Sequence, residues 1–173
     1  MSKEHEEDRS NWTVQQWTDY AKAGNKDLKG ANLKLANLEG ADLEGIHLRG
    51  ADLEGANLKR ANLKRAILWR ANLEGADLSG TNLKGAGLGG ANLWGANLVG
   101  ADLEDAQLQR AQLWHAGLER ANFKGANLYQ VKLIDANLRG ANLDGAYLLG
   151  AIFKGACLAG LDRDELRKRV AGF

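Results

Sequence analysis

The sequence predicts an all-β solenoid, in which the chain coils around its own axis and stacks one coil on the next. Every fifth residue from Leu28 to Leu158 is Leu or Phe, and this pattern fills 27 positions without a change of register. Two residues before these positions stands Ala in 23 cases, and the residue directly before is usually Asn or Asp. The pentad commonly ends in Gly, so the repeat over residues 26–160 reads A-(N/D)-L-x-G.

A five-residue period fits neither a helix nor a flat strand. On an α-helix, at about 100° per residue, successive Leu residues would spread over every face. On a flat strand, an odd period would send them alternately to opposite faces. A chain that turns a corner once per pentad keeps every Leu inside. Gly permits the positive φ of such a turn, and Asn or Asp can hydrogen-bond to the nearby backbone.

On these pentads the chain resembles the pentapeptide-repeat family. Its A(D/N)LXX consensus is matched by Ala31-Asn32-Leu33-Lys34, Ala71-Asn72-Leu73-Glu74-Gly75 and Ala96-Asn97-Leu98-Val99-Gly100. The resemblance implies a right-handed quadrilateral parallel β-helix with four pentads per coil, and therefore about seven coils for 27 pentads. The family includes DNA-mimicking inhibitors of DNA gyrase and many members, abundant in cyanobacteria, without assigned biochemistry. The near-uniform Ala and Leu of this chain resemble the cyanobacterial group.

The ends of the repeat predict short α-helical caps, which solenoids need to cover their open ends. We divide the chain into an N-terminal tail and capping helix (1–25), the repeat (26–160) and a C-terminal capping helix (161–173). Thr13 and Gln16 form a capping-box pattern, with Trp12 and Trp17 at the staple positions around it.

The C-terminal boundary is predicted from the end of the Leu pattern. The next Leu position is occupied by Arg163, so the coil must stop there. Asp162 and Glu165 form a second capping box around the start of the final helix.

The composition is that of an ordinary soluble protein, with 45% apolar and 26% charged residues. No apolar run approaches the roughly 20 residues of a membrane span, and the polar first residues are unlike a signal peptide. The single cysteine, Cys157, cannot form an internal disulfide, so we predict a reducing, cytoplasmic location. The alternative is a mature form from which a leader was removed.

Charge and residue types exclude several functions. The repeats carry 16 Lys and Arg against 14 Asp and Glu, which is neither the negative field of a DNA mimic nor the positive excess of a general nucleic-acid binder. The sequence has no catalytic constellation, no metal-ligand spacing and no phosphate-binding loop. We therefore predict a protein that is not an enzyme, with no catalytic, cofactor-binding or metal-binding residues and no cofactor.

The outward residues after each Leu are more informative, because they form four columns with a spacing of 20 residues. Two adjacent columns hold six apolar residues in 14 positions, and the other two hold two in 13. Together with apolar residues just before the Leu, they give a candidate interface: Trp69, Trp94, Trp114, Tyr129, Ile134, Tyr147 and Leu149. Exposed contiguous apolar area often marks an interface; the alternative is ladder packing between coils.

The sequence thus predicts a rigid, non-enzymatic scaffold for protein–protein interaction, whose partner it does not identify. A homodimer through the C-terminal helix or the apolar faces is one form that this interaction could take, and the charge argues against nucleic acid as a partner. Two other functions stay open. One is inhibition or protection of DNA gyrase by DNA mimicry, and the other is a structural repeat with no dedicated partner.

Overall fold

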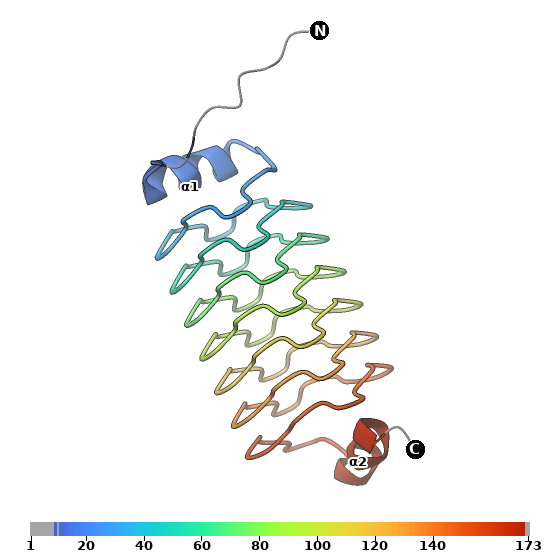
Figure 1. Cartoon of the computed structure of the whole chain (residues 1–173). Helices are drawn as coiled ribbons and strands as arrows, with labels where there is room; N and C mark the ends of the chain where they lie inside the picture. The colour runs from blue at the N-terminus through green and yellow to red at the C-terminus, as the bar shows by residue number, and fades with distance from the viewer. Residues whose placement is uncertain (1–8, 10, 172–173) are drawn as a thin grey trace, which may run out of the picture.

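The chain forms a stack of coils with a helix at each end (Figure 1). The structure is a computed structural model and describes residue 9 and residues 11–171. Parts of the two predicted end segments, residues 1–8, 10 and 172–173, therefore lie outside the described residues. Helix α1 spans Val14–Lys22 before the first coil, and helix α2 spans Arg163–Ala171 after the last.

The coils are held together by parallel pairing with a constant register of 20 residues. Every bridge joins a residue to the one 20 positions later, from Asp27 with His47 to Asn137 with Cys157. The amide of Asp52 donates to the carbonyl of Ala31 at 2.9 Å, and the amide of Leu33 donates to the carbonyl of Asp52 at 2.7 Å. Four pentads therefore complete one coil. The predicted right-handed quadrilateral parallel β-helix with short helical caps is confirmed.

The interior is filled by the Leu and Ala of each pentad. The central Leu side chains of the pentads, from Leu28 to Leu138, are fully buried, as is Phe123, with 0% of their surface exposed. The Ala positions beside them are equally closed along most of the stack. Large and small residues thus alternate around a narrow core with no room for a central channel.

The last residue of each pentad turns the corner with a positive φ. Most corners are Gly, as predicted, with φ near that of Gly75 at 63°. Ten corners hold other residues in the same left-handed conformation, which L-residues adopt at a cost. They are Leu35, Arg60, Arg65, Arg70, Asp105, Arg110, His115, Arg120, Gln130 and Asp135.

The Asn and Asp residues before the Leu make two kinds of hydrogen bond. The Oδ1 of Asn72 accepts from the amide of Glu74 at 3.3 Å, which is the predicted local bond. The side-chain amide of Asn92 also donates to Asn72 at 3.1 Å, and that of Asn72 donates to Asp52 at 3.0 Å. These side chains therefore form a ladder that ties consecutive coils together.

The N-terminal end is closed by α1. The predicted capping box is present: the Thr13 hydroxyl accepts from the amide of Gln16, and the Gln16 side chain accepts from the amide of Thr13. The rings of Trp12 and Trp17 lie 4.8 Å apart. Trp17 and Ala21 are buried and belong to the same hydrophobic core as the coils, so α1 covers the first coil.

The C-terminal end is covered only in part by α2. Asp162 accepts from the amides of Asp164 and Glu165 at 2.9 and 3.0 Å, which forms one half of the predicted capping box. From the last turn, the Arg169 guanidinium donates to the carbonyl oxygens of Leu143 and Ala146 and so satisfies part of the open coil edge.

Candidate protein-interaction surface

The four sides of the coil stack carry different side chains. We number them by pentads: the first face contains residues 26–30 and every fourth pentad after it, and the second, third and fourth faces begin at residues 31, 36 and 41. Among the described residues, six of the seven exposed large hydrophobic side chains lie on the first two faces. They are Ile67, Trp69 and Tyr147 on the first face and Leu35, Trp94 and Ile152 on the second.

On the second face, two of the candidate tryptophans contact each other across one coil. The rings of Trp94 and Trp114 lie 6.4 Å apart at 67°, an edge-to-face arrangement. Trp94 is 47% exposed, whereas Trp114 is half-buried. The Lys132 ammonium lies 5.5 Å from the centroid of the Trp114 ring. Ile134 is half-buried one coil further along the same column. The pair therefore has one packed member and one open member.

On the first face, near the C-terminal end, a second aromatic pair has the same construction. The ring of Tyr129 stacks on that of Tyr147, with centroids 6.1 Å apart and planes 17° from parallel. Tyr147 is 50% exposed, while Tyr129 and the neighbouring Leu149 are half-buried. The structure thus places six of the seven candidate residues in the C-terminal half of two adjacent faces.

Trp69 lies apart from this group. It is on the first face, but Gly89 and Gln109 stand between it and Tyr129 in the same column. A Cβ atom on Gly87 would lie 2.5 Å from Nε1 of Trp69, and one on Gly89 would lie 2.5 Å from its Cζ3. The indole therefore rests on the backbone of the next coil and spans both glycines. Sequence reasoning missed this contact, although a pentad with two outward glycines, Ala86-Gly87-Leu88-Gly89-Gly90, signals it.

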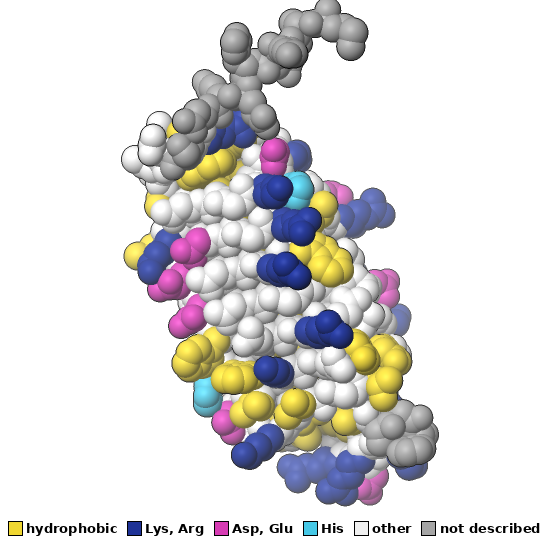
Figure 2. All heavy atoms as spheres, viewed as in Figure 1, with side chains coloured by type: hydrophobic (Ala, Val, Ile, Leu, Met, Phe, Trp, Pro, Cys, Tyr) yellow, Lys and Arg dark blue, Asp and Glu magenta, His cyan; other side chains and the backbone are white. Residues whose placement is uncertain are grey.

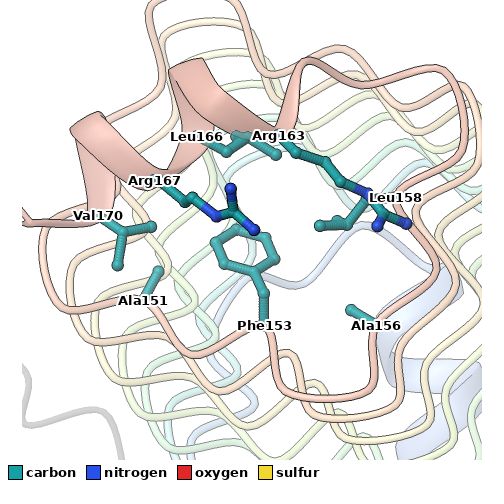
Figure 3. A pocket seen from close by; sticks show the side chains of 8 residues that line it. All are labelled: Ala151, Phe153, Ala156, Leu158, Arg163, Leu166, Arg167 and Val170. Atoms are coloured by element: carbon teal, nitrogen blue, oxygen red, sulfur yellow. The ribbon is translucent and has the colours of Figure 1, made fainter.

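The open C-terminal end contains an apolar pocket of about 400 Å³ between the last coil and α2 (Figure 3). Phe153 lies at its floor beside Leu158, and Leu166 and Val170 of α2 form one wall. The side chains of Arg163 and Arg167 extend from the helix over the opening. Phe153 and Leu158 are half-buried, unlike the Leu residues of the middle coils. This end is therefore the least protected part of the core.

The perturbed ionisable groups lie on the surface of the stack or at a helix cap. Hydrogen bonding to Glu54 and the charge of its carboxylate raise the pKa of Lys34, and Glu104 and Asp102 raise the pKa of Lys84 in the same way. Burial pushes the pKa of Asp77 up, but hydrogen bonds from Ser79, aided by other neighbours, bring it below the ordinary value of 3.8. These shifts arise from local pairing and turn formation.

Among residues 9 and 11–171, no group of three or more His, Cys, Asp or Glu side chains could hold a metal ion. Neither α1 nor α2, the helices of that part, is long and apolar enough to cross a membrane.

Coil register, corner geometry and the Leu–Ala interior define a right-handed quadrilateral β-helix in which the side chains after each central Leu point outward. The chain belongs to the pentapeptide-repeat family. The family model "Pentapeptide repeats" matches it in 8 copies, over residues 20–50, 46–85, 56–95, 86–125 and 126–162. Among curated proteins, no match to this chain was found.

Several solved structures are similar. HetL, a pentapeptide repeat protein involved in heterocyst differentiation regulation from the cyanobacterium Nostoc sp. strain PCC 7120, is 38% identical, with a TM-score of 0.51 over 76% of this chain and 70% of HetL. Rfr23 from the cyanobacterium Cyanothece 51142 is 31% identical, with a TM-score of 0.46 over 76% of this chain and 87% of Rfr23. A thylakoid-lumen pentapeptide repeat protein of Arabidopsis thaliana is 37% identical, with a TM-score of 0.36 over 54% of this chain and 70% of that protein.

Proposed function

We propose that this chain is a rigid, non-enzymatic scaffold that binds a protein partner through the two aromatic pairs at its C-terminal half. The observation that carries the proposal is that each pair joins a half-buried aromatic ring to an exposed one. Trp94 is 47% exposed beside Trp114, and Tyr147 is 50% exposed beside Tyr129. Aromatic side chains dominate the binding energy of many interfaces, and these four lie on two adjacent faces.

The ladder contacts make these side chains suitable anchors. A side chain that is already held in place loses little conformational freedom when a partner binds, so more of its contact area contributes to affinity. Trp114 and Tyr129 hold the exposed rings in this way, and the coil backbone beneath them is fixed by its hydrogen bonds on both sides. Ladder packing and partner binding are therefore compatible roles for the same residues.

The relationship to HetL favours a binding role over a catalytic one, because HetL is described as involved in regulation of differentiation. The proposal places the protein in the cytoplasm. Cys157 is exposed and free, which suits a reducing compartment.

Mimicry of DNA is the weaker alternative, because the most acidic face is interrupted by lysines. The fourth face carries six carboxylates but also four basic residues. Lys84 contacts Asp102 at 3.2 Å and Glu104 at 2.9 Å, and Lys124 lies 3.9 Å from Glu104. A regular column of unpaired negative charge, which a phosphate mimic needs, is thus broken at these coils. We expect no inhibition of gyrase supercoiling at micromolar protein.

A second copy of this chain is an alternative partner to a different protein. The half-buried Phe153 and Leu158 at the open C-terminal end favour it, since an end-to-end contact would cover both. Light scattering of the purified protein distinguishes the two: a monomer at micromolar concentration argues for a different protein.

The proposal is tested with the double variant Trp94→Ser, Trp114→Ser. A control double variant, Leu35→Ser, Val99→Ser, removes exposed apolar side chains that belong to neither aromatic pair, because Leu35 lies at the N-terminal end of the second face and Val99 on the third face. The aromatic variant should no longer capture the partner protein from an extract of the host cell. In calorimetry, the purified variant should bind the purified partner at least tenfold more weakly, as expected for loss of a hot spot. The control should bind as the original chain does. Equal binding of the two folded variants would overturn the proposal.

A further inference from the structure

The net positive charge of the repeat is concentrated on one face, because that face has few carboxylates. The first face carries five Lys and Arg residues and a single carboxylate, Asp27. The fourth face carries four basic and six acidic residues. The near-neutral sum over all pentads therefore conceals a strongly basic side of the rod. A row of Lys and Arg side chains runs down the molecule beside hydrophobic ones in Figure 2.

Trp69 presents a flat ring on this basic face. The five-membered part of the indole lies on Gly87 and the six-membered part on Gly89, since a Cβ at either glycine would come within 2.5 Å of the ring. One face of the indole is thus fixed against the backbone of the next coil. Trp69 is still 43% exposed, so its opposite face is open to solvent.

Two arginines line a hollow together with this ring. This hollow of about 440 Å³ is lined by His47, Arg49, Ile67, Trp69 and Arg70. Cγ of Arg70 lies 3.6 Å from the Cβ position of Gly90, so the stem of Arg70 crosses the corner of the next coil next to the indole. Within residues 9 and 11–171, neither Arg49 nor Arg70 forms an ion pair with a carboxylate.

We propose that this site binds a nucleotide, with its base stacked on Trp69 and its phosphate paired with Arg49 and Arg70. Stacking on an aromatic side chain accepts every base, because each has a π face. Guanidinium groups pair bidentately with phosphate oxygens. An acidic peptide would use the two arginines but not the flat open indole. Bases paired within a duplex are also unsuitable, because their faces are covered by their neighbours.

The nucleotide can be free or part of a single strand, since the recognised chemistry is the same. Lys29 and Arg110 lie on the same face on either side of the site along the rod. A single strand running along the face would reach these additional cations, whereas a mononucleotide would not. The site does not use Trp94 or Trp114, so it stands or fails independently of the protein-binding surface.

The test is calorimetry of the full chain with ATP and, separately, with a short single-stranded oligothymidylate. Trp69→Ala should weaken binding by about tenfold or more, the effect of losing one stacked base. Trp69→Phe should restore most of the affinity, and its melting curve checks that the fold is intact. Trp94→Ala is the matched control, because Trp94 is 47% exposed against 43% for Trp69, and it should leave nucleotide binding unchanged.

The outcomes distinguish a free mononucleotide from a nucleotide within a single strand, and both of these from an acidic peptide. Binding of ATP and of the oligonucleotide, both dependent on Trp69, supports a mononucleotide site. Binding of the oligonucleotide alone, with a salt dependence that weakens in an Arg49→Gln, Arg70→Gln variant, supports a single-strand site. Unchanged affinity in Trp69→Ala, or binding of a poly-glutamate peptide with neither nucleotide bound, would overturn the proposal.

Discussion

The hydroxyl of Thr81 donates a hydrogen bond of 2.8 Å to the carbonyl oxygen of Leu58, inside the coil stack. Thr81 occupies an inward position that Ala holds in most pentads, and its surface is fully buried. Its hydroxyl is tolerated there because it has this partner. The bond joins two consecutive coils through the core, which the Ala residues at equivalent positions cannot do.

Thr81→Val should therefore destabilise the protein by about 1 kcal/mol, the net value of a typical hydrogen bond. The larger cost of an unpaired acceptor is avoided, because the carbonyl of Leu58 also accepts from the amide of Ala61 at 3.0 Å. Chemical denaturation followed by circular dichroism gives the change. A Val variant as stable as the original chain would show that the bond contributes nothing.

The inward and outward positions should differ sharply in their tolerance of a polar residue. Leu98 is fully buried, whereas the next residue, Val99, is 39% exposed. Leu98→Asn should cost about 3 kcal/mol or more, because it loses apolar burial and encloses an amide without partners. Val99→Asn should cost less than about 1 kcal/mol. Thermal melting of the two variants provides the comparison, and similar losses would contradict the assignment of the faces.

The coiled chain with a Leu-filled interior could be predicted from the sequence because of one period. A bulky Leu at each fifth residue, with Ala two residues before it, favours an arrangement in which all of these Leu side chains are buried together. The right hand and the four pentads per coil were implied by the resemblance to the pentapeptide-repeat family. The capping box at Thr13 and Gln16 was also predictable, since its bonds join residues three apart in the chain. These features depend on local sequence or on a strict repeat.

The details of the surface depend on contacts between coils, and a single pentad does not contain them. The position of Trp69 on Gly87 and Gly89 becomes readable only when the register of 20 residues is known. Trp114 and Trp94 belong to the same outward column, but the sequence does not show that Trp114 is half-buried beside Lys132. The incomplete cover over Phe153 likewise depends on where α2 docks.

The corner residues offer a stabilising change. Leu35 has a φ of 58° and is 72% exposed, so it is strained and gains little from burial. Leu35→Gly should raise stability by about 0.5 kcal/mol, because relief of about 1–2 kcal/mol of left-handed strain exceeds the extra freedom of Gly in the unfolded chain. The reverse change at an equivalent corner, Gly75→Ala, should destabilise. Denaturation midpoints of the two variants test the sign, and a less stable Leu35→Gly chain would refute the strain argument.

The cap of α2 should respond to acid through Asp162. Hydrogen bonds from the amides of Glu165 and Asp164 hold the pKa of this carboxyl below its ordinary value of 3.8, with a smaller contribution from Lys168. Because the folded-state pKa is lowered, the charged Asp162 carboxylate stabilises α2 at pH values above the ordinary carboxyl pKa. This stabilisation is lost as the pH falls through the folded-state pKa.

In Asp162→Asn the side-chain oxygen can still accept these bonds but does not titrate. NMR titration of the Asp164 and Glu165 amide shifts should therefore show an acid transition below pH 3.8 in the original chain and none of that size in the Asn variant. The same transition in both chains would assign it to another carboxyl and remove Asp162 as the cause.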